Sequence, residues 1–243
     1  MFLHLLISFL LPSFAVTPPP ANGTVKITFV NMVKQEKMRL NETAYINPYG
    51  EEYTIRKFKY YVSHVALAKG IKTTGPKGTY YLVDESKPAS QSFSFTVPAG
   101  SYDNFSFLLG VDSLRNISGA QSGALDPLND MFWTWNTGYV MAKMEAVSPQ
   151  SAIVNSKVEY HIGGFSGVNN VLRNIQLSLG SSMLKVKPGR TSEIIIEADA
   201  DNWWQPYPIR IKENPGCTVT GELARHIADN YAAMFRIKKI VSP

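Results

Sequence analysis

Hydrophobic and polar residues alternate with a period of two along much of the chain after residue 22. In the first run, Val25, Ile27 and Phe29 alternate with Lys26 and Thr28, which is typical of a half-buried strand. Comparable apolar runs recur at 58–67, 80–83, 93–97, 105–109, 158–162, 175–179 and 194–196, and turns with Gly or Pro follow several of them. Many short strands separated by turns indicate an all-β fold, and we expect a β-sandwich of short antiparallel strands.

The segment 58–67, FKYYVSHVAL, is apolar on both of its faces. A strand with this pattern is buried on both sides, so we expect it in the centre of a sheet between two layers. In this alternation His64 shares a face with Phe58 and Tyr60.

A helical pattern occurs only near the end of the chain, at 221–237 (GELARHIADNYAAMFRI). Leu223, Ile227 and Tyr231 follow one another at four-residue spacing, which predicts an amphipathic C-terminal helix. The chain shows no internal repeat and no linker long enough to divide it. We therefore expect residues 23–243 to form one β-sandwich domain with a docked C-terminal helix.

The N-terminus has the features of a secretory signal. An apolar run from Phe2 to Leu11 precedes Ser13-Phe14-Ala15, a small-x-small cleavage pattern, so residues 1–15 are predicted to be a signal peptide. The run is too short to span a bilayer, and residues 16–22 form a Pro-rich spacer. The alternative, a buried N-terminal strand, is disfavoured by Pro18 to Pro20. We expect an exported protein of the periplasm or the cell surface, with no spanning segment in the mature chain.

Composition and motifs narrow the function classes. The chain is 44% hydrophobic and 18% charged, which supports a packed core, and its net charge of +5 is too dispersed for nucleic-acid binding. The single cysteine, Cys217, excludes an intramolecular disulfide. No P-loop, dinucleotide fingerprint or nucleophile elbow is present, so we do not expect an enzyme. A weaker option assigns acid or base chemistry to Asp112, Asp126 or Glu145.

Histidines are the best candidate metal ligands. Outside the predicted signal peptide they are His64, His161 and His226. Imidazole together with sulfur from methionine suits Cu(I), although a histidine within a strand is more often an ordinary core or surface residue. His161 differs because Gly163 and Gly164 follow it and let backbone approach closely.

Two tryptophans stand one residue apart in the segment 126–146, DPLNDMFWTWNTGYVMAKMEA. If this segment is a strand, Trp133 and Trp135 share one face. A hydrophobic core explains such a pair, and so does a binding site.

The segment 110–149, GVDSLRNISGAQSGALDPLNDMFWTWNTGYVMAKMEAVSP, resembles the central motif of the MbnP-like family. Further segments match this family in the expected order: FKYYVSHVAL (58–67), VPAGSYDNFSFLLGVD (97–112), YHIGGFSG (160–167) and HIADNYAAMF (226–235). The family consists of exported copper-binding proteins, related to the methanobactin-associated MbnP and to copper-repressible surface proteins of methanotrophs. The resemblance therefore implies a β-rich sandwich and an exported protein for copper acquisition, storage or delivery.

The resemblance also implies candidate ligands and partners. Relatives bind copper through histidines and, in some members, a tryptophan oxidised to kynurenine by a MauG-type di-haem peroxidase; a TonB-dependent uptake system is the other implied partner. Trp133, Trp135 and His161 lie where the family pattern is densest. Relatives carry Asn at the position of His64, which is thus either an additional ligand or a simple substitution.

The alternative function is a metal-free β-sandwich that binds a protein or a glycan at the cell surface. Two histidines close together beside a tryptophan favour copper, and three separated histidines favour the alternative.

Overall fold

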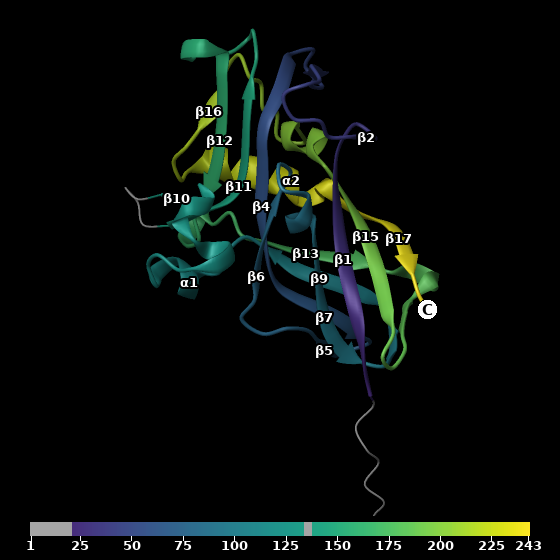
Figure 1. Ribbon diagram of the computed structural model, residues 1–243. Helices are drawn as coiled ribbons and strands as arrows, with labels where there is room; N and C mark the ends of the chain where they lie inside the picture. Colours follow the sequence, from purple (N-terminus) through teal and green to yellow (C-terminus); the bar gives the residue numbers. More distant parts are fainter. Residues whose placement is uncertain (1–20, 134–137) are drawn as a thin grey trace, which may run out of the picture.

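Two β-sheets make up most of the molecule. The computed structural model describes residues 21–133 and 138–243 (Figure 1). The smaller, five-stranded sheet has the order β17-β15-β1-β2: β17 (Phe235–Val241), β15 (Thr191–Asp199), β1 (Asn22–Val33) and β2 (Glu36–Lys37). The fifth strand, β7 (Ser92–Pro98), pairs with β1 along the edge that faces away from β15.

The larger sheet is built around the long strand β4. Its order is β13-β9-β4-β11-β12-β16: β13 (Arg173–Ser178), β9 (Asn104–Leu109), β4 (Glu52–Lys69), β11 (Gly138–Val147), β12 (Lys157–Gly163) and β16 (Gly216–Cys217). Short strands extend it, with β10 (Phe132–Trp133) on β11 and β3 (Tyr45–Ile46), β5 (Lys72–Thr74) and β6 (Tyr80–Asp84) on β4. A separate two-stranded ribbon pairs β8 (Gly100–Tyr102) with β14 (Leu184–Val186). The α-helices of the described residues are α1 (Ser113–Ile117) and α2 (Glu222–Tyr231).

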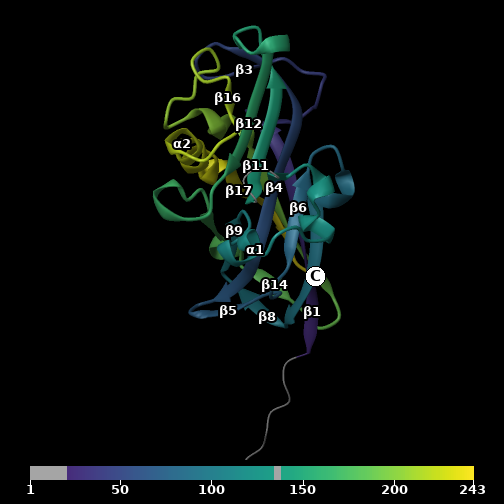
Figure 2. The same ribbon diagram turned by 90° about the vertical axis from the view of Figure 1, so that its left-hand side faces the viewer.

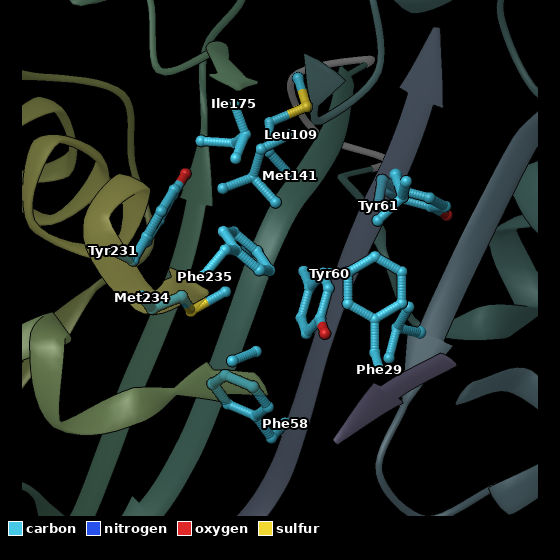
Figure 3. Close-up of a cluster of buried hydrophobic side chains, with 14 of the residues drawn as sticks. Phe29, Phe58, Tyr60, Tyr61, Leu109, Met141, Ile175, Tyr231, Met234 and Phe235 are labelled. Atoms are coloured by element: carbon cyan, nitrogen blue, oxygen red, sulfur yellow. The ribbon is translucent and has the colours of Figure 1, made fainter. Parts of the chain in front are cut away.

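An aromatic cluster joins the two sheets. Phe29 of β1 makes an edge-to-face contact with Tyr60 of β4, at 5.8 Å between ring centroids (Figure 3). It makes another with Phe107 of β9, at 5.9 Å. Phe235 at the start of β17 closes the cluster, 5.0 Å from Phe107. Since each buried aromatic ring removes about 150–250 Å² of surface from water, this cluster is a major source of the attraction between the sheets.

The expectation of a mainly-β protein with a helix near its C-terminus is confirmed. Each of the predicted strand segments lies in or overlaps an observed strand, and 58–67 lies in β4, the central strand of the larger sheet. The strands are neither all short nor all antiparallel. β4 has 18 residues, β1 runs parallel to β15 from the pair Thr24–Thr191 to the pair Met32–Asp199, and β12 is parallel to β16.

The C-terminal helix is shorter than predicted. α2 ends at Tyr231, a short 3-10 turn follows, and the chain continues as β17 along β15, with Ile237 opposite Ile196. The residues from 235 onward thus belong to a strand, because β15 offers a free edge for backbone hydrogen bonds.

The N-terminal predictions fall mostly outside the described residues. The predicted signal peptide, 1–15, and residues 16–20 of the predicted spacer lie outside the described residues. Asn22, which was expected to end the spacer, is the first residue of β1. Within residues 21–133 and 138–243, no helix has the length and apolar character needed to cross a membrane.

Candidate functional site

The motif segment around Trp133 lies on the outer face of the larger sheet. Phe58 and Tyr60 of β4 point to the aromatic core, so Lys57 and Lys59, which alternate with them along the strand, point outward. Register places Lys143 of β11 opposite both Lys59 and His161 of β12. We call this side of β4, β11 and β12 the outer face.

Lysines of the outer face hold the segment that leads to Trp133. Lys59 Nζ donates to the carbonyl of Asn129 at 3.0 Å, and the nearly buried Lys143 Nζ donates to the carbonyl of Asp130 and lies 3.1 Å from its Oδ1. Lys57 Nζ lies 3.0 Å from Asp130 Oδ2. Three ammonium groups therefore hold Asn129 and Asp130, which lie four and three residues before Trp133.

Trp133 packs edge-on against a glycine of β12. A Cβ atom built on Gly163 would lie only 2.5 Å and 2.6 Å from Cζ3 and Cη2 of the indole ring, so this contact requires glycine. Gly163 and His161 are two residues apart on one strand and share the outer face. Trp133 is only 6% exposed, and it lines a cavity of about 690 Å³ together with Asn116, Tyr139 and Phe165. Trp135, the other tryptophan of the motif, lies outside the described residues.

His161 is bound to the carboxylate of Glu145 on the neighbouring strand. Nε2 of His161 lies 3.0 Å from Glu145 Oε1, while Lys57 and Lys143 lie 3.1 Å and 3.7 Å from the same carboxylate. The hydrogen bond from His161, helped by these two lysines against the effect of burial, lowers the pKa of Glu145 to about 2. An ionised carboxylate only accepts hydrogen bonds, so Nε2 carries the proton and, in the neutral ring, Nδ1 is an electron-pair donor.

The network around His161 is close to neutral. Burial opposes the ionisation of Asp130, but the hydrogen bonds from Lys57 and Lys143 prevail and lower its pKa. Two carboxylates, of Glu145 and Asp130, therefore balance two ammonium groups, of Lys57 and Lys143, beside the His161 ring.

The pKa of Glu145 predicts how this network responds to acid. A carboxyl group whose pKa is lowered from 4.5 to about 2 on folding contributes stability above pH 4.5, and this contribution is lost as the pH falls through 2. Above pH 5, Glu145→Gln should lower the free energy of unfolding by about 2 kcal/mol, and the difference from wild type should shrink between pH 4.5 and 2. Urea unfolding at a series of pH values measures this difference. Glu159→Gln, on the adjacent strand, is the matched control, and a pH-independent difference for Glu145→Gln would contradict the prediction.

His64 occupies a bulge rather than a regular strand position. The register between β4 and β9 shifts between Ser63 and Ala66, and His64 has φ of 50° with a side chain that is 57% exposed. It therefore does not share the buried face of Phe58 and Tyr60, contrary to the alternation of the sequence. Asn and His tolerate this left-handed conformation better than most residues, so the backbone itself explains a substitution between these two residues.

His64 also has its own carboxylate partner. Its Nε2 lies 3.0 Å from Asp112 Oδ2, and Asp112 accepts hydrogen bonds from the Tyr80 hydroxyl and, as the N-cap of α1, from the backbone of Arg115. Asp126 likewise accepts from the backbone of Leu128. Asp112 and Asp126 therefore serve as helix caps, and Glu145, with its low pKa, is ionised at neutral pH.

His226 lies on α2 in a third environment. Its ring stacks on Tyr207 at 4.2 Å with an interplanar angle of 7°, and its Nε2 is 3.7 Å from Glu222. Within the described ranges, no three side chains of His, Cys, Asp or Glu converge to hold a metal ion. The structure thus places the three histidines on β4, α2 and β12 with separate carboxylates, and of the three His161 shares a strand face with the glycine that contacts Trp133.

Sequence reasoning missed the lysines that organise this site. Lys57, Lys59 and Lys143 were visible as cations inside otherwise apolar strands, which is an unusual position for lysine. The Gly163-Gly164 pair predicts a close approach of backbone, and at Gly164 this is the carbonyl oxygen of Asn169, 2.7 Å from an added Cβ atom. At Gly163 the approaching group is instead a side chain, the Trp133 indole. Burial raises the pKa of the Cys217 thiol to about 11, which leaves it an unreactive thiol.

Comparison with known proteins gives two matches. Residues 22–219 match the family model MbnP. Among solved structures, MbnP from Methylosinus trichosporium is similar, with a TM-score of 0.51, 14% identity and coverage of 83% of each chain, a likeness that concerns the fold. No curated protein matches the chain.

Proposed function

The chain belongs to the MbnP family, and on that premise we propose that it is an exported copper-binding protein, located in the periplasm or at the cell surface, for acquisition, storage or delivery of the metal. Its task in this proposal is binding without turnover. Copper is the cargo.

The observation that carries the proposal is the placement of His161 beside the motif segment. Its ring is oriented by Glu145, in the manner of the carboxylate partners that orient metal-ligating histidines, and this leaves Nδ1 as a donor. Neutral imidazole is a good ligand for copper, and the balanced charges nearby do not repel a cation strongly. We therefore assign His161 as one ligand and leave His64 and His226 out of this site, since each has a different environment.

The remaining parts of the proposal come from family membership. They are oxidation of a tryptophan, Trp133 or Trp135, to kynurenine, a MauG-type di-haem peroxidase as the oxidising partner, and a TonB-dependent uptake system. Trp133 lies on the outer face rather than between the sheets, which favours its oxidation by a partner enzyme. Its side chain is only 6% exposed, however, which disfavours direct contact with that enzyme.

Copper affinity in single variants tests this assignment. We expect the full chain to bind Cu(I) in competition with a chromophoric chelator, and His161→Ala to lose at least 100-fold in affinity. Glu145→Gln should lose about 10–100-fold, because it releases the orientation of the ring. His226→Ala is the matched control and should bind as wild type does. Unchanged affinity in His161→Ala would remove this residue from the site, and intact mass after coexpression with a peroxidase reports tryptophan oxidation.

A second candidate function has its own support. In the described part of the chain each histidine has a separate carboxylate and no three-ligand cluster forms, as expected for a metal-free protein that binds a protein or glycan at the cell surface. A wild-type chain that binds no copper in the same titration, and that carries unmodified tryptophans, would favour this candidate.

A further inference from the structure

One end of the molecule carries two cationic turns, which we call the first and the second tip. The turn between β4 and β5 has Lys69 and Lys72 at its base, and the turn between β14 and β15 begins with Lys187 and ends with Arg190 (Figure 2). Lys185 of β14 lies just before the second tip. We call these five exposed residues the basic pole.

Backbone contacts connect the two tips and the start of β1 into one surface. Gly70 in the first tip donates its N–H to Asp103 Oδ2 at 2.9 Å, and the residue before Asp103, Tyr102, pairs with Leu184 of β14. In the second tip, Gly189 donates to the carbonyl of Asn22 at 2.9 Å. The tips are therefore held together by the fold.

The charge of the basic pole is not compensated locally. Over residues 21–133 and 138–243, none of its five side chains forms an ion pair, whereas Lys26 on the adjacent stretch of β1 is neutralised by Glu193 at 3.0 Å. The chain has 24 basic and 19 acidic residues. The basic pole accounts for five of the basic residues, and Asp103 is the acidic residue that we count at this end. The rest of the chain then has 19 basic and 18 acidic residues. Most of the net charge of the protein is thus concentrated here.

An apolar side chain projects from the same end. Ile71, at the apex of the first tip between Lys69 and Lys72, is 100% exposed. An isoleucine that is fully exposed to water contributes no hydrophobic stabilisation to the fold. An isoleucine flanked by lysines suits the boundary between lipid headgroups and acyl chains.

The chain also enters the domain at this end. β1 begins with Asn22 beside the second tip (Figures 1 and 2), so the start of the described domain belongs to the same end of the molecule.

We propose that the basic pole docks on an anionic phospholipid surface, with the five cations contacting headgroup phosphates and Ile71 inserted between them. Lipid fits better than nucleic acid, because five charges form a small footprint and Tyr102, the aromatic residue of this surface, is only 5% exposed and offers no stacking platform. The proposal concerns where the protein resides and does not depend on copper.

Sedimentation of the full chain with phospholipid vesicles tests the proposal. Binding to phosphatidylcholine vesicles that contain phosphatidylserine should exceed binding to phosphatidylcholine alone and should fall when salt is raised from about 50 to 500 mM. Each basic residue near such a surface contributes roughly fivefold to partitioning, so Lys187→Gln with Arg190→Gln should reduce binding by about 25-fold. Ile71→Ser should reduce it several-fold.

A matched double variant controls for the loss of two positive charges. Every variant keeps the N-terminal apolar run, so binding through that run would be equal in all of them. Lys37→Gln with Lys212→Gln removes two exposed cations near the other end of β4, where the backbone N–H of Lys212 donates to Glu51, and should bind vesicles as wild type does. Equal binding to neutral vesicles, or equal losses in the two double variants, would overturn the proposal. Retention of single-stranded DNA by the basic pole with an affinity above that for vesicles would also overturn it.

Discussion

Replacing Glu51 with alanine is expected to lower the free energy of unfolding by about 4 kcal/mol. Glu51, 7% exposed, immediately precedes β4, and its carboxylate accepts hydrogen bonds from the backbone N–H groups of Ile211 and Lys212 at 2.7 Å and 2.9 Å and from the side chain of Asn47 at 2.7 Å. Alanine leaves these donors unsatisfied in a buried environment. This carboxylate holds the segment around residue 211 next to the start of β4. In the alanine variant we therefore expect this segment to detach before the rest of the domain unfolds.

Urea unfolding followed by circular dichroism measures the loss. Glu213→Ala is the matched control, since that glutamate is 65% exposed and its contact with Arg210 is a 3.7 Å surface pair; its effect should stay within about 0.5 kcal/mol. Glu51→Gln should be intermediate, because the amide keeps one acceptor oxygen. A loss of less than about 1 kcal/mol for Glu51→Ala would show that the segment near residue 211 has other sufficient anchors.

Substitution of Gly163 by alanine is expected to cost about 3 kcal/mol and to disturb the candidate site. The new Cβ atom would meet the Trp133 ring at 2.5 Å and the carbonyl oxygen of Tyr139 at 3.1 Å, so either the indole or strand β12 must move. Asn129 and Asp130 are held by lysines a few residues before Trp133, which limits how far the indole can retreat. We expect a changed tryptophan fluorescence spectrum and, if His161 binds copper, a weaker affinity for Cu(I).

Gly216→Ala provides the control for Gly163→Ala. Gly216 lies in β16, next to β12, but a Cβ atom there would meet the flexible end of Ile153 at 3.3 Å and the carbonyl oxygen of Glu159 at 3.6 Å. It should therefore cost much less and leave the fluorescence unchanged. Gly163→Ala with wild-type stability and spectrum would contradict the prediction, because the added Cβ atom would then displace neither the Trp133 indole nor strand β12.

The candidate site shows where local sequence reasoning stops. Placing His161 next to Glu145 requires the antiparallel register of β11 and β12, which contains a shift between Val140 and Ala142. A one-residue slip would turn one of these side chains to the opposite face. His64 gives the converse case. Its alternation with Phe58 and Tyr60 is correct as a pattern, but the shift of β9 along β4 turns His64 out of that face.

The sequence by itself determined the mainly-β character, most strand positions, the helix near the C-terminus and the MbnP family, because periodicity and a long continuous motif are properties of neighbouring residues. Only the tertiary structure decided that β1 runs parallel to β15, that the last residues form a strand, and that Trp133, Gly163 and His161 come together while His64 and His226 remain apart. Those outcomes depend on contacts between distant segments, whose register follows from the packing of the whole core rather than from any one run of residues.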